Sequence, residues 1–172
     1  LEKFQFESIN SNKNLSTHEN FFHGIQKIKY YMFLSTGIPF SLVDSTYVSQ
    51  ILQAYAIRQV AEAHRRSKGY CWGSMFWQLN DAWPSISWSS IDYYGYWNAL
   101  QYDIARVYDS ISISFEGDVV YFINDEINDV KGKYEFSIIS FAGEIQYQYS
   151  LDISMKGNSL TRVFLERNFD AR

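Results

Sequence analysis

The sequence predicts an α/β segment followed by an all-β domain. Two helix-forming stretches, residues 47–66 and 97–108, flank a short apolar run of the kind found in buried strands. From residue 110 onward, short runs alternate apolar with polar residues, which is typical of antiparallel strands. We therefore place a domain boundary between residues 109 and 110, with one domain over 1–109 and a second over 110–172.

The first 43 residues predict a loop and a short helix. The stretch from Ser8 to Asn20 is rich in Asn and Ser, as loops are. A helix is expected from about His23 to Leu34, ending before Gly37-Ile38-Pro39.

The strongest helix signal lies between Tyr47 and Arg66. Apolar residues recur there at three- and four-residue spacing, and Asp44 and Ser45 offer N-cap oxygens. The last turn is basic and Gly69 follows it, which is the expected end of a helix.

The run from Tyr70 to Leu79 is mostly apolar and stands between Gly69 and the polar pair Asn80-Asp81. These features predict a buried strand. A further helix is expected from Trp97 to Tyr108, with Leu100, Ile104 and Val107 on one face. Helix, buried strand and helix in this order indicate a parallel α/β layer.

Five strands with regular turns are predicted in the C-terminal domain, which indicates an antiparallel sandwich. A structural role is expected for it, because it has almost no clusters of chemically active side chains. They are Ile111–Phe115, Val119–Ile123, Tyr134–Ser140, Ile145–Ile153 and Leu160–Leu165. Turns are expected at 116–118, 124–125, Gly132, 142–143 and 157–158.

Composition excludes several classes of protein. The chain has 172 residues and a net charge of −4, so nucleic-acid binding is not expected. Cys71 is the single cysteine, and no Cys/His cluster has the spacing of metal ligands, so neither a metal nor a cofactor is predicted. No apolar run approaches the length of a membrane span.

Aromatic residues are concentrated in one region. They make up 19% of the chain, and all 5 Trp lie between Trp72 and Trp97, mixed with amides and carboxylates. Pyranose rings stack on indole faces while their hydroxyls bind amide and carboxylate groups. A sugar site is one interpretation of this pattern, and a structural aromatic cluster under a long loop is the other.

The same residues carry a family resemblance. Residues 75–84, with 87–95 and 97–102 behind them, resemble the eighth strand and following loop of the β-mannosidases of glycoside hydrolase family 2. Residues 47–54 and 62–66 resemble the seventh barrel helix of that family, and 123–125 resemble the start of its immunoglobulin-like domain.

The resemblance implies a fold. Residues 1–109 would be the last part of a (β/α)8 TIM barrel, comprising the seventh helix, eighth strand and eighth helix. Residues 110–172 would be a truncated immunoglobulin-like β-sandwich. A complete barrel takes about 250 residues and a complete sandwich about 100, so neither fits whole.

The resemblance also implies a function, retaining hydrolysis of terminal nonreducing β-D-mannose residues. Two glutamates about 5–5.5 Å apart perform that reaction, and in the family both precede the matched region. We assign no catalytic residue in this chain, because neither Glu2 nor Glu7 lies in a recognisable nucleophile motif. The implied partners are a β-mannoside oligosaccharide or glycoprotein-derived glycan and the remainder of the barrel. The compartment, lysosomal, periplasmic or cytoplasmic, stays open.

Four residues are the candidates for substrate binding. Trp77 is expected to form the platform for the nonreducing sugar, with Asn80 and Trp83 beside it. Asp81 would bind a hydroxyl or fix the loop by bonding nearby backbone. Structural roles are expected for Asp92, Trp88 and Trp97.

Two alternatives remain from the sequence. The chain could be a noncatalytic carbohydrate-binding or structural fragment, because the catalytic glutamates are not identified in it. A sister enzyme of family 2, such as an exo-β-glucosaminidase or a β-galactosidase, would share the same architecture.

Overall fold

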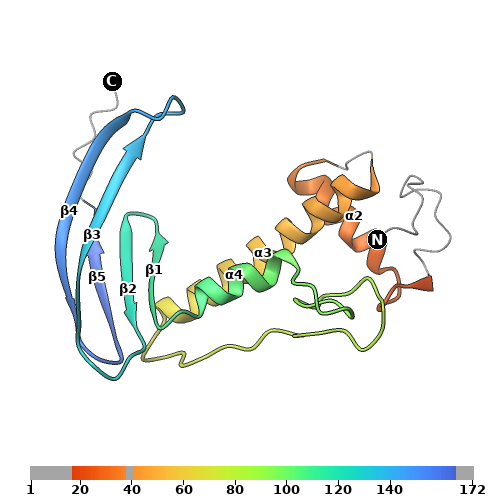
Figure 1. The fold of residues 1–172 in the computed structure, drawn as a ribbon, viewed down its shortest axis with the longest axis horizontal. Helices are drawn as coiled ribbons and strands as arrows, with labels where there is room; N and C mark the ends of the chain where they lie inside the picture. The colour runs from red at the N-terminus through yellow and green to blue at the C-terminus, as the bar shows by residue number, and fades with distance from the viewer. Residues whose placement is uncertain (1–16, 38–40, 166–172) are drawn as a thin grey trace. The chain divides into compact units, whose positions relative to one another are not determined.

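The computed structural model describes residues 17–37 and 41–165 of the chain. These ranges contain helices α2 (Gly24–Ser35), α3 (Leu42–Arg66) and α4 (Ala99–Val107). They also contain strands β1 (Ile111–Glu116), β2 (Val119–Asn124), β3 (Val130–Ile139), β4 (Ile145–Met155) and β5 (Ser159–Phe164) (Figure 1). Glu2, Glu7 and most of the loop expected over residues 8–20 lie outside the described residues.

The chain divides into two compact units. The first combines Leu1–Ala63 with Gly73–Val107, and the second combines His64–Trp72 with Tyr108–Arg172. The first unit therefore contains α2, α4 and most of α3, and the second contains the end of α3 and the five strands. Each unit has its own cluster of buried apolar residues.

Helix α2 confirms the short helix expected from about His23 to Leu34. Helix α3 begins at Leu42, five residues before the predicted start at Tyr47. Ser41 caps it, because the Asp44 N–H donates to Ser41 Oγ at 3.0 Å and Ser41 Oγ donates to Asp44 Oδ2 at 2.6 Å. The prediction that Asp44 and Ser45 are the N-caps is wrong, since both lie inside the helix. The C-terminal end at Arg66 is confirmed.

The buried strand predicted from Tyr70 to Leu79 is wrong. In the structure this segment is extended but belongs to no sheet, and Met75 is 100% exposed. A strand needs a neighbouring strand along its length, and neither sheet in the described ranges includes residues 70–79. Burial nevertheless alternates along the segment as it does in a strand: Ser74, Phe76 and Gln78 are half-buried, and the residues between them are exposed.

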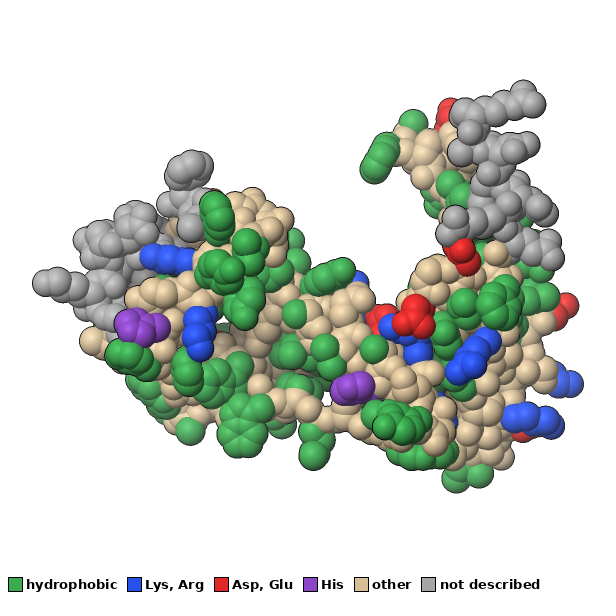
Figure 2. Space-filling view, turned by 180° about the vertical axis from the view of Figure 1, so that it is seen from behind, with side chains coloured by type: hydrophobic (Ala, Val, Ile, Leu, Met, Phe, Trp, Pro, Cys, Tyr) green, Lys and Arg blue, Asp and Glu red, His purple; other side chains and the backbone are tan. Residues whose placement is uncertain are grey.

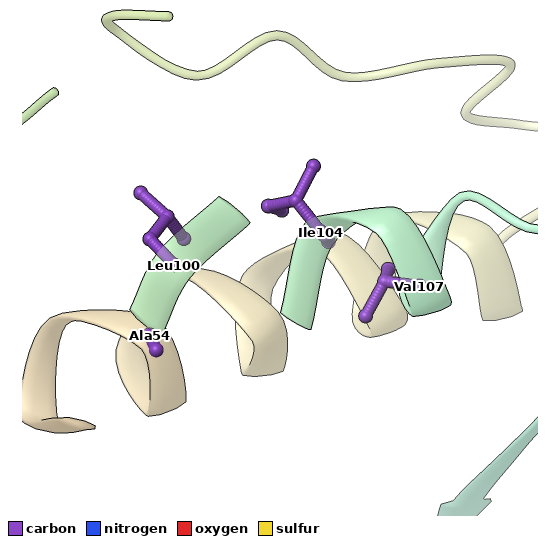
Figure 3. Packing of buried hydrophobic residues seen from close by; sticks show 5 residues of the cluster. Ala54, Leu100, Ile104 and Val107 are labelled. Carbon is purple, nitrogen blue, oxygen red and sulfur yellow. The ribbon is translucent and has the colours of Figure 1, made fainter. Parts of the chain in front are cut away.

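Helices α3 and α4 pack against each other in the first unit. Ala54 and Ala61 of α3 and Leu100, Ile104 and Val107 of α4 are buried together, as Figure 3 shows for four of them. The half-buried Phe76 of the extended segment packs on the same cluster. The apolar face predicted for the second helix is therefore confirmed.

The five strands predicted for the C-terminal part are confirmed, and all their pairings are antiparallel. They form two sheets, one with the order β1-β2-β5 and one made of β3 and β4. Residues from both sheets build the core of this unit, including Val120, Phe122, Tyr134, Ile153 and Met155. The turn predicted at Gly132 is wrong, because Gly132 lies inside β3 opposite Ile153. No helix in the described ranges is long and apolar enough to cross a membrane.

Candidate functional site

The aromatic loop, residues 77–97, is an ordered structure of the first unit. After the extended segment the chain turns back, so that Ile91 lies parallel to Asn80 in an isolated bridge. The Ile91 N–H donates to the Leu79 carbonyl at 2.8 Å, and the Ser90 N–H donates to the Gln78 carbonyl at 3.1 Å. These bonds satisfy backbone groups that would otherwise need water or a sheet partner.

Asp81 lies at the centre of this loop. Its side chain is buried, with 6% of the residue exposed, and its Oδ1 accepts hydrogen bonds from Ser87 Oγ and Ser89 Oγ, both at 2.7 Å. Hydrogen bonds to an ionised acceptor are stronger than neutral ones. The geometry favours the loop-fixing role for Asp81 over direct contact with a hydroxyl of the ligand.

The other three candidates lie at the surface of the same unit. Trp77 is 75% exposed, Trp83 is 41% exposed and Asn80 is exposed as well. Asn80 Nδ2 donates to the Asp81 carbonyl at 3.3 Å, and the peptide bond between Trp77 and Gln78 is cis. Exposed indole rings beside an exposed side-chain amide are chemically suited to stacking on a sugar and bonding its hydroxyls.

Trp83 differs from Trp77 in having a ring partner. The imidazole of His18 stacks on the indole of Trp83, with a centroid separation of 5.8 Å and an interplanar angle of 20°. Within the described part of the chain, no aromatic ring contacts Trp77. The indole of Trp83 is therefore stacked on one side, whereas that of Trp77 has no stacking ring among the described residues.

The residues given structural roles have local partners. Trp88 forms a T-shaped pair with Phe21, with ring centroids 6.4 Å apart, and Trp97 forms one with Tyr102 at 5.1 Å. Asp92 Oδ1 accepts from the N–H groups of Tyr94 at 2.9 Å and Tyr96 at 2.8 Å, which closes the turn that contains Gly95. Gly95 has φ 86°, a conformation that glycine adopts without strain.

Glutamine side chains of α3 hold the loop against the helices, a role that the sequence reasoning missed. Gln50 Nε2 donates to Asn98 Oδ1 at 3.0 Å while Gln50 Oε1 accepts from the Ala99 N–H at 3.1 Å, at the start of α4. Gln53 Nε2 donates to the Trp88 carbonyl at 2.7 Å. These partners lie 35 to 49 residues apart in the chain, so no local pattern predicts them.

The contacts of His18 with the aromatic loop were not predicted from the sequence either. Its Nδ1 lies 2.8 Å from the Pro84 carbonyl oxygen, in addition to the ring contact with Trp83. The described residues contain no group of three His, Cys, Asp or Glu side chains placed to hold a metal ion.

Curated proteins similar to this chain are β-mannosidases. The goat enzyme is 38% identical over 88 residues, which is 46% of this chain and 10% of the goat protein. β-Mannosidase B of Aspergillus niger is 36% identical over 70 residues, or 39% of this chain and 8% of that protein. The chain spans about a tenth of the length of these relatives. No family model matches the chain.

Solved structures are similar over most of the chain. The β-D-mannosidase of Dictyoglomus thermophilum superposes with a TM-score of 0.75 and 27% identity, covering 91% of this chain and 20% of that one. The exo-chitosanase CsxA of Amycolatopsis orientalis, solved with PNP-β-D-glucosamine, has a TM-score of 0.73 at 21% identity over 88% of this chain and 19% of its own. The second likeness concerns the fold alone.

Together the fold and these matches relate the chain to the glycoside hydrolases of family 2. The curated relatives reported above are all β-mannosidases, and the chain is homologous to a segment of these enzymes. The resemblance found in the sequence is therefore confirmed.

Proposed function

We propose that this chain forms one wall of the sugar pocket of a β-mannosidase-type retaining glycosidase. The observation that carries the proposal is the aromatic loop, in which Trp77 and Asn80 are presented to solvent while Asp81 and the buried Ser89 fix the backbone beneath them. Rigid aromatic surfaces with adjacent amides suit a pyranose, since ordering the site on binding costs little.

The proposal includes a finer description of the fold. Residues 1–109 would be the last part of the TIM barrel, and 110–172 a truncated immunoglobulin-like sandwich. The extended segment 70–79 would occupy the place of the eighth strand. In support, Phe76 faces the helix cluster, as a barrel strand does on its outer side, while Met75, Trp77 and Leu79 are exposed on the other.

Exposed apolar surface supports the remainder of the barrel as a partner. Hydrophobic side chains are visible at several places on the described surface in Figure 2, and large exposed ones of the first unit include Tyr47, Met75 and Leu79. Exposed apolar side chains that gather in one region can mark an interaction surface. The two catalytic glutamates would come from residues outside those described here, and the substrate would be a β-mannoside oligosaccharide or a glycoprotein-derived glycan.

A panel of chromogenic glycosides tests the proposal. We expect the gene product that carries this chain to hydrolyse 4-nitrophenyl β-D-mannoside with a higher kcat/KM than the matching β-D-glucosaminide or β-D-galactoside. Preference for one of the other sugars would identify a sister enzyme. Absence of hydrolysis together with mannose-dependent quenching of tryptophan fluorescence would support a noncatalytic binding module instead.

A segment exchange tests the contribution of this chain separately. The equivalent segment of the Dictyoglomus thermophilum β-D-mannosidase would be replaced by residues 73–98 of this chain, which include most of the extended segment and the aromatic loop. We expect the chimera to retain β-mannosidase activity and to lose it on Trp77→Ala. A folded but inactive chimera would contradict the role of this loop as a pocket wall.

A further inference from the structure

Three contacts join the segment around His18 to the part of the aromatic loop that carries Trp83. The His18 ring stacks on the Trp83 indole at 5.8 Å, and its Nδ1 lies 2.8 Å from the Pro84 carbonyl oxygen. Glu19 forms a parallel bridge with Ile86, in which the Ile86 N–H donates to the His18 carbonyl at 2.7 Å. The Asn20 N–H returns to the Ile86 carbonyl at 3.2 Å.

The hydrogen bond fixes the orientation of the imidazole. A carbonyl oxygen only accepts, so the proton must be on Nδ1, and Nδ1–H donates to Pro84. Rotation of the ring about its Cβ–Cγ bond would break this hydrogen bond, so the bond restrains the orientation of the imidazole. In this orientation the planes of the His18 and Trp83 rings are nearly parallel, with an interplanar angle of 20°.

The segment that carries His18 is itself anchored. Glu19 Oε1 accepts from the Ile25 N–H at 3.2 Å, in the first turn of α2, and the Phe21 and Trp88 rings form a T-shaped pair. We call the contacts of His18 with Trp83 and Pro84 the clamp. The segment that carries the clamp is therefore connected both to α2 and to the aromatic loop. Trp83, held in this way, still has 41% of its surface exposed for a ligand.

We propose that His18 is a positioning residue for Trp83, setting the orientation in which the exposed part of the indole meets a sugar. The inference rests on the proposed function, because it takes Trp83 as part of the sugar site. In this proposal His18 acts through the indole that it contacts. Trp77 has no such clamp among the described residues, so the effect should be confined to Trp83.

The test separates the two contacts of the imidazole. His18→Phe keeps an aromatic ring for stacking but loses the hydrogen bond, His18→Asn keeps an N–H donor near the Nδ1 position but loses the ring, and His18→Ala loses both. We expect KM for 4-nitrophenyl β-D-mannoside to rise about 3- to 10-fold in His18→Ala, with less than a twofold change in kcat, because the indole contributes binding that is similar in ground and transition states. The Phe and Asn variants should recover part of the loss. His23→Asn is the control, since exposed His23 has φ 61°, which Asn tolerates.

Two further measurements make the outcome decisive. Near-UV circular dichroism of the Trp83 band, obtained by subtracting the spectrum of Trp83→Phe, needs no turnover and should lose intensity in His18→Ala. An unchanged Trp83 band and an unchanged KM in His18→Ala would overturn the inference. Trp83→Ala distinguishes this failure from that of the proposed function: if it also leaves KM unchanged, Trp83 is not part of the sugar site at all.

Discussion

Ser89 donates a 2.7 Å hydrogen bond to Asp81 in the interior of the aromatic loop, and both residues are almost completely buried. The loop therefore has a polar core of its own beneath aromatic rings that are largely exposed. The backbone next to Trp77 is also held, because the Gln78 carbonyl accepts from the Ser90 N–H and the Leu79 carbonyl from the Ile91 N–H.

Removing the Asp81 carboxylate should destabilise the loop. Asp81→Ala leaves the hydroxyls of Ser87 and Ser89 without their shared acceptor, and an unsatisfied buried polar group costs about 1–3 kcal/mol. Asp81→Asn keeps one acceptor oxygen and should cost less. Urea unfolding measures both variants. Equal stability of Asp81→Ala and the wild type would contradict the central place of this carboxylate.

The core between α3 and α4 should be sensitive to the loss of volume at Leu100. This residue is 1% exposed, and its replacement by Ala opens a cavity that costs about 2–5 kcal/mol. Ala105 lies on the exposed side of the same helix, so Ala105→Gln should change the free energy of unfolding by less than about 0.5 kcal/mol. Similar effects of the two substitutions would show that the helices do not pack as described.

Two glycines of the second unit, Gly157 and Gly132, should respond oppositely to replacement by alanine. A Cβ on Gly157 would lie 1.9 Å from the backbone oxygen of Ile127, so Gly157→Ala must displace backbone and destabilise the unit. A Cβ on Gly132 would meet no atom within 4 Å, and Gly132 lies inside β3, where Ala is preferred by roughly 0.5–1 kcal/mol. Thermal unfolding of the two variants checks the sign of each effect.

Acid should weaken the ion-pair cluster that Asp125 forms with Arg65 and Lys68 in the second unit. Burial raises the pKa of Asp125, but the hydrogen bond from Lys68 and the positive charges of Arg65 and Lys68 outweigh it, so the pKa lies below the usual carboxyl value. A lowered folded-state pKa contributes stability that is present above the unfolded pKa of about 3.9 and disappears as pH falls through the folded value. Asp125→Asn should therefore reduce the loss of stability below about pH 4.

The matched control for that experiment is Asp152→Asn. Asp152 is exposed on β4, and no salt bridge to it occurs in the described ranges. Its replacement should leave the acid dependence of unfolding close to that of the wild type. An Asp125→Asn curve that overlays the wild-type curve from about pH 5 to about pH 2 would contradict the stabilising role of the cluster.

The sequence predicted secondary structure well where periodicity and caps act locally. Helix α4 follows from its apolar periodicity and the five strands from alternation and turn residues, and Gly117 and Gly143 have the positive φ angles that such turns need. The start of β3 was misplaced, at Tyr134 instead of Val130, because Gly132 was taken as a turn. The start of α3 was misplaced because Ser41, Asp44 and Ser45 are all suitable caps, and only the geometry distinguishes Ser41. The strand at 70–79 was wrong because sheet formation depends on a distant partner, which a local apolar run does not reveal.

The candidate site was predictable in part because its residues are close together in the sequence. Trp77, Asn80, Asp81 and Trp83 lie within one short motif, and their proximity needs no tertiary structure. Contacts across long separations, such as the one between His18 and Pro84, 66 residues apart, carry no sequence signal of their own. The clamp on Trp83 is visible only once the chain is folded.

Kinetics of Trp77→Ala decide whether the aromatic loop takes part in sugar binding and turnover. Trp72→Ala is the matched control, because Trp72 is similarly exposed but precedes the aromatic loop and belongs to the other unit. In the gene product that carries this chain, we expect Trp77→Ala to lower kcat/KM for 4-nitrophenyl β-D-mannoside at least about tenfold, equivalent to about 1.4 kcal/mol, and Trp72→Ala to change it less than twofold. Wild-type kinetics in Trp77→Ala would contradict the claim that this loop forms a wall of the sugar pocket.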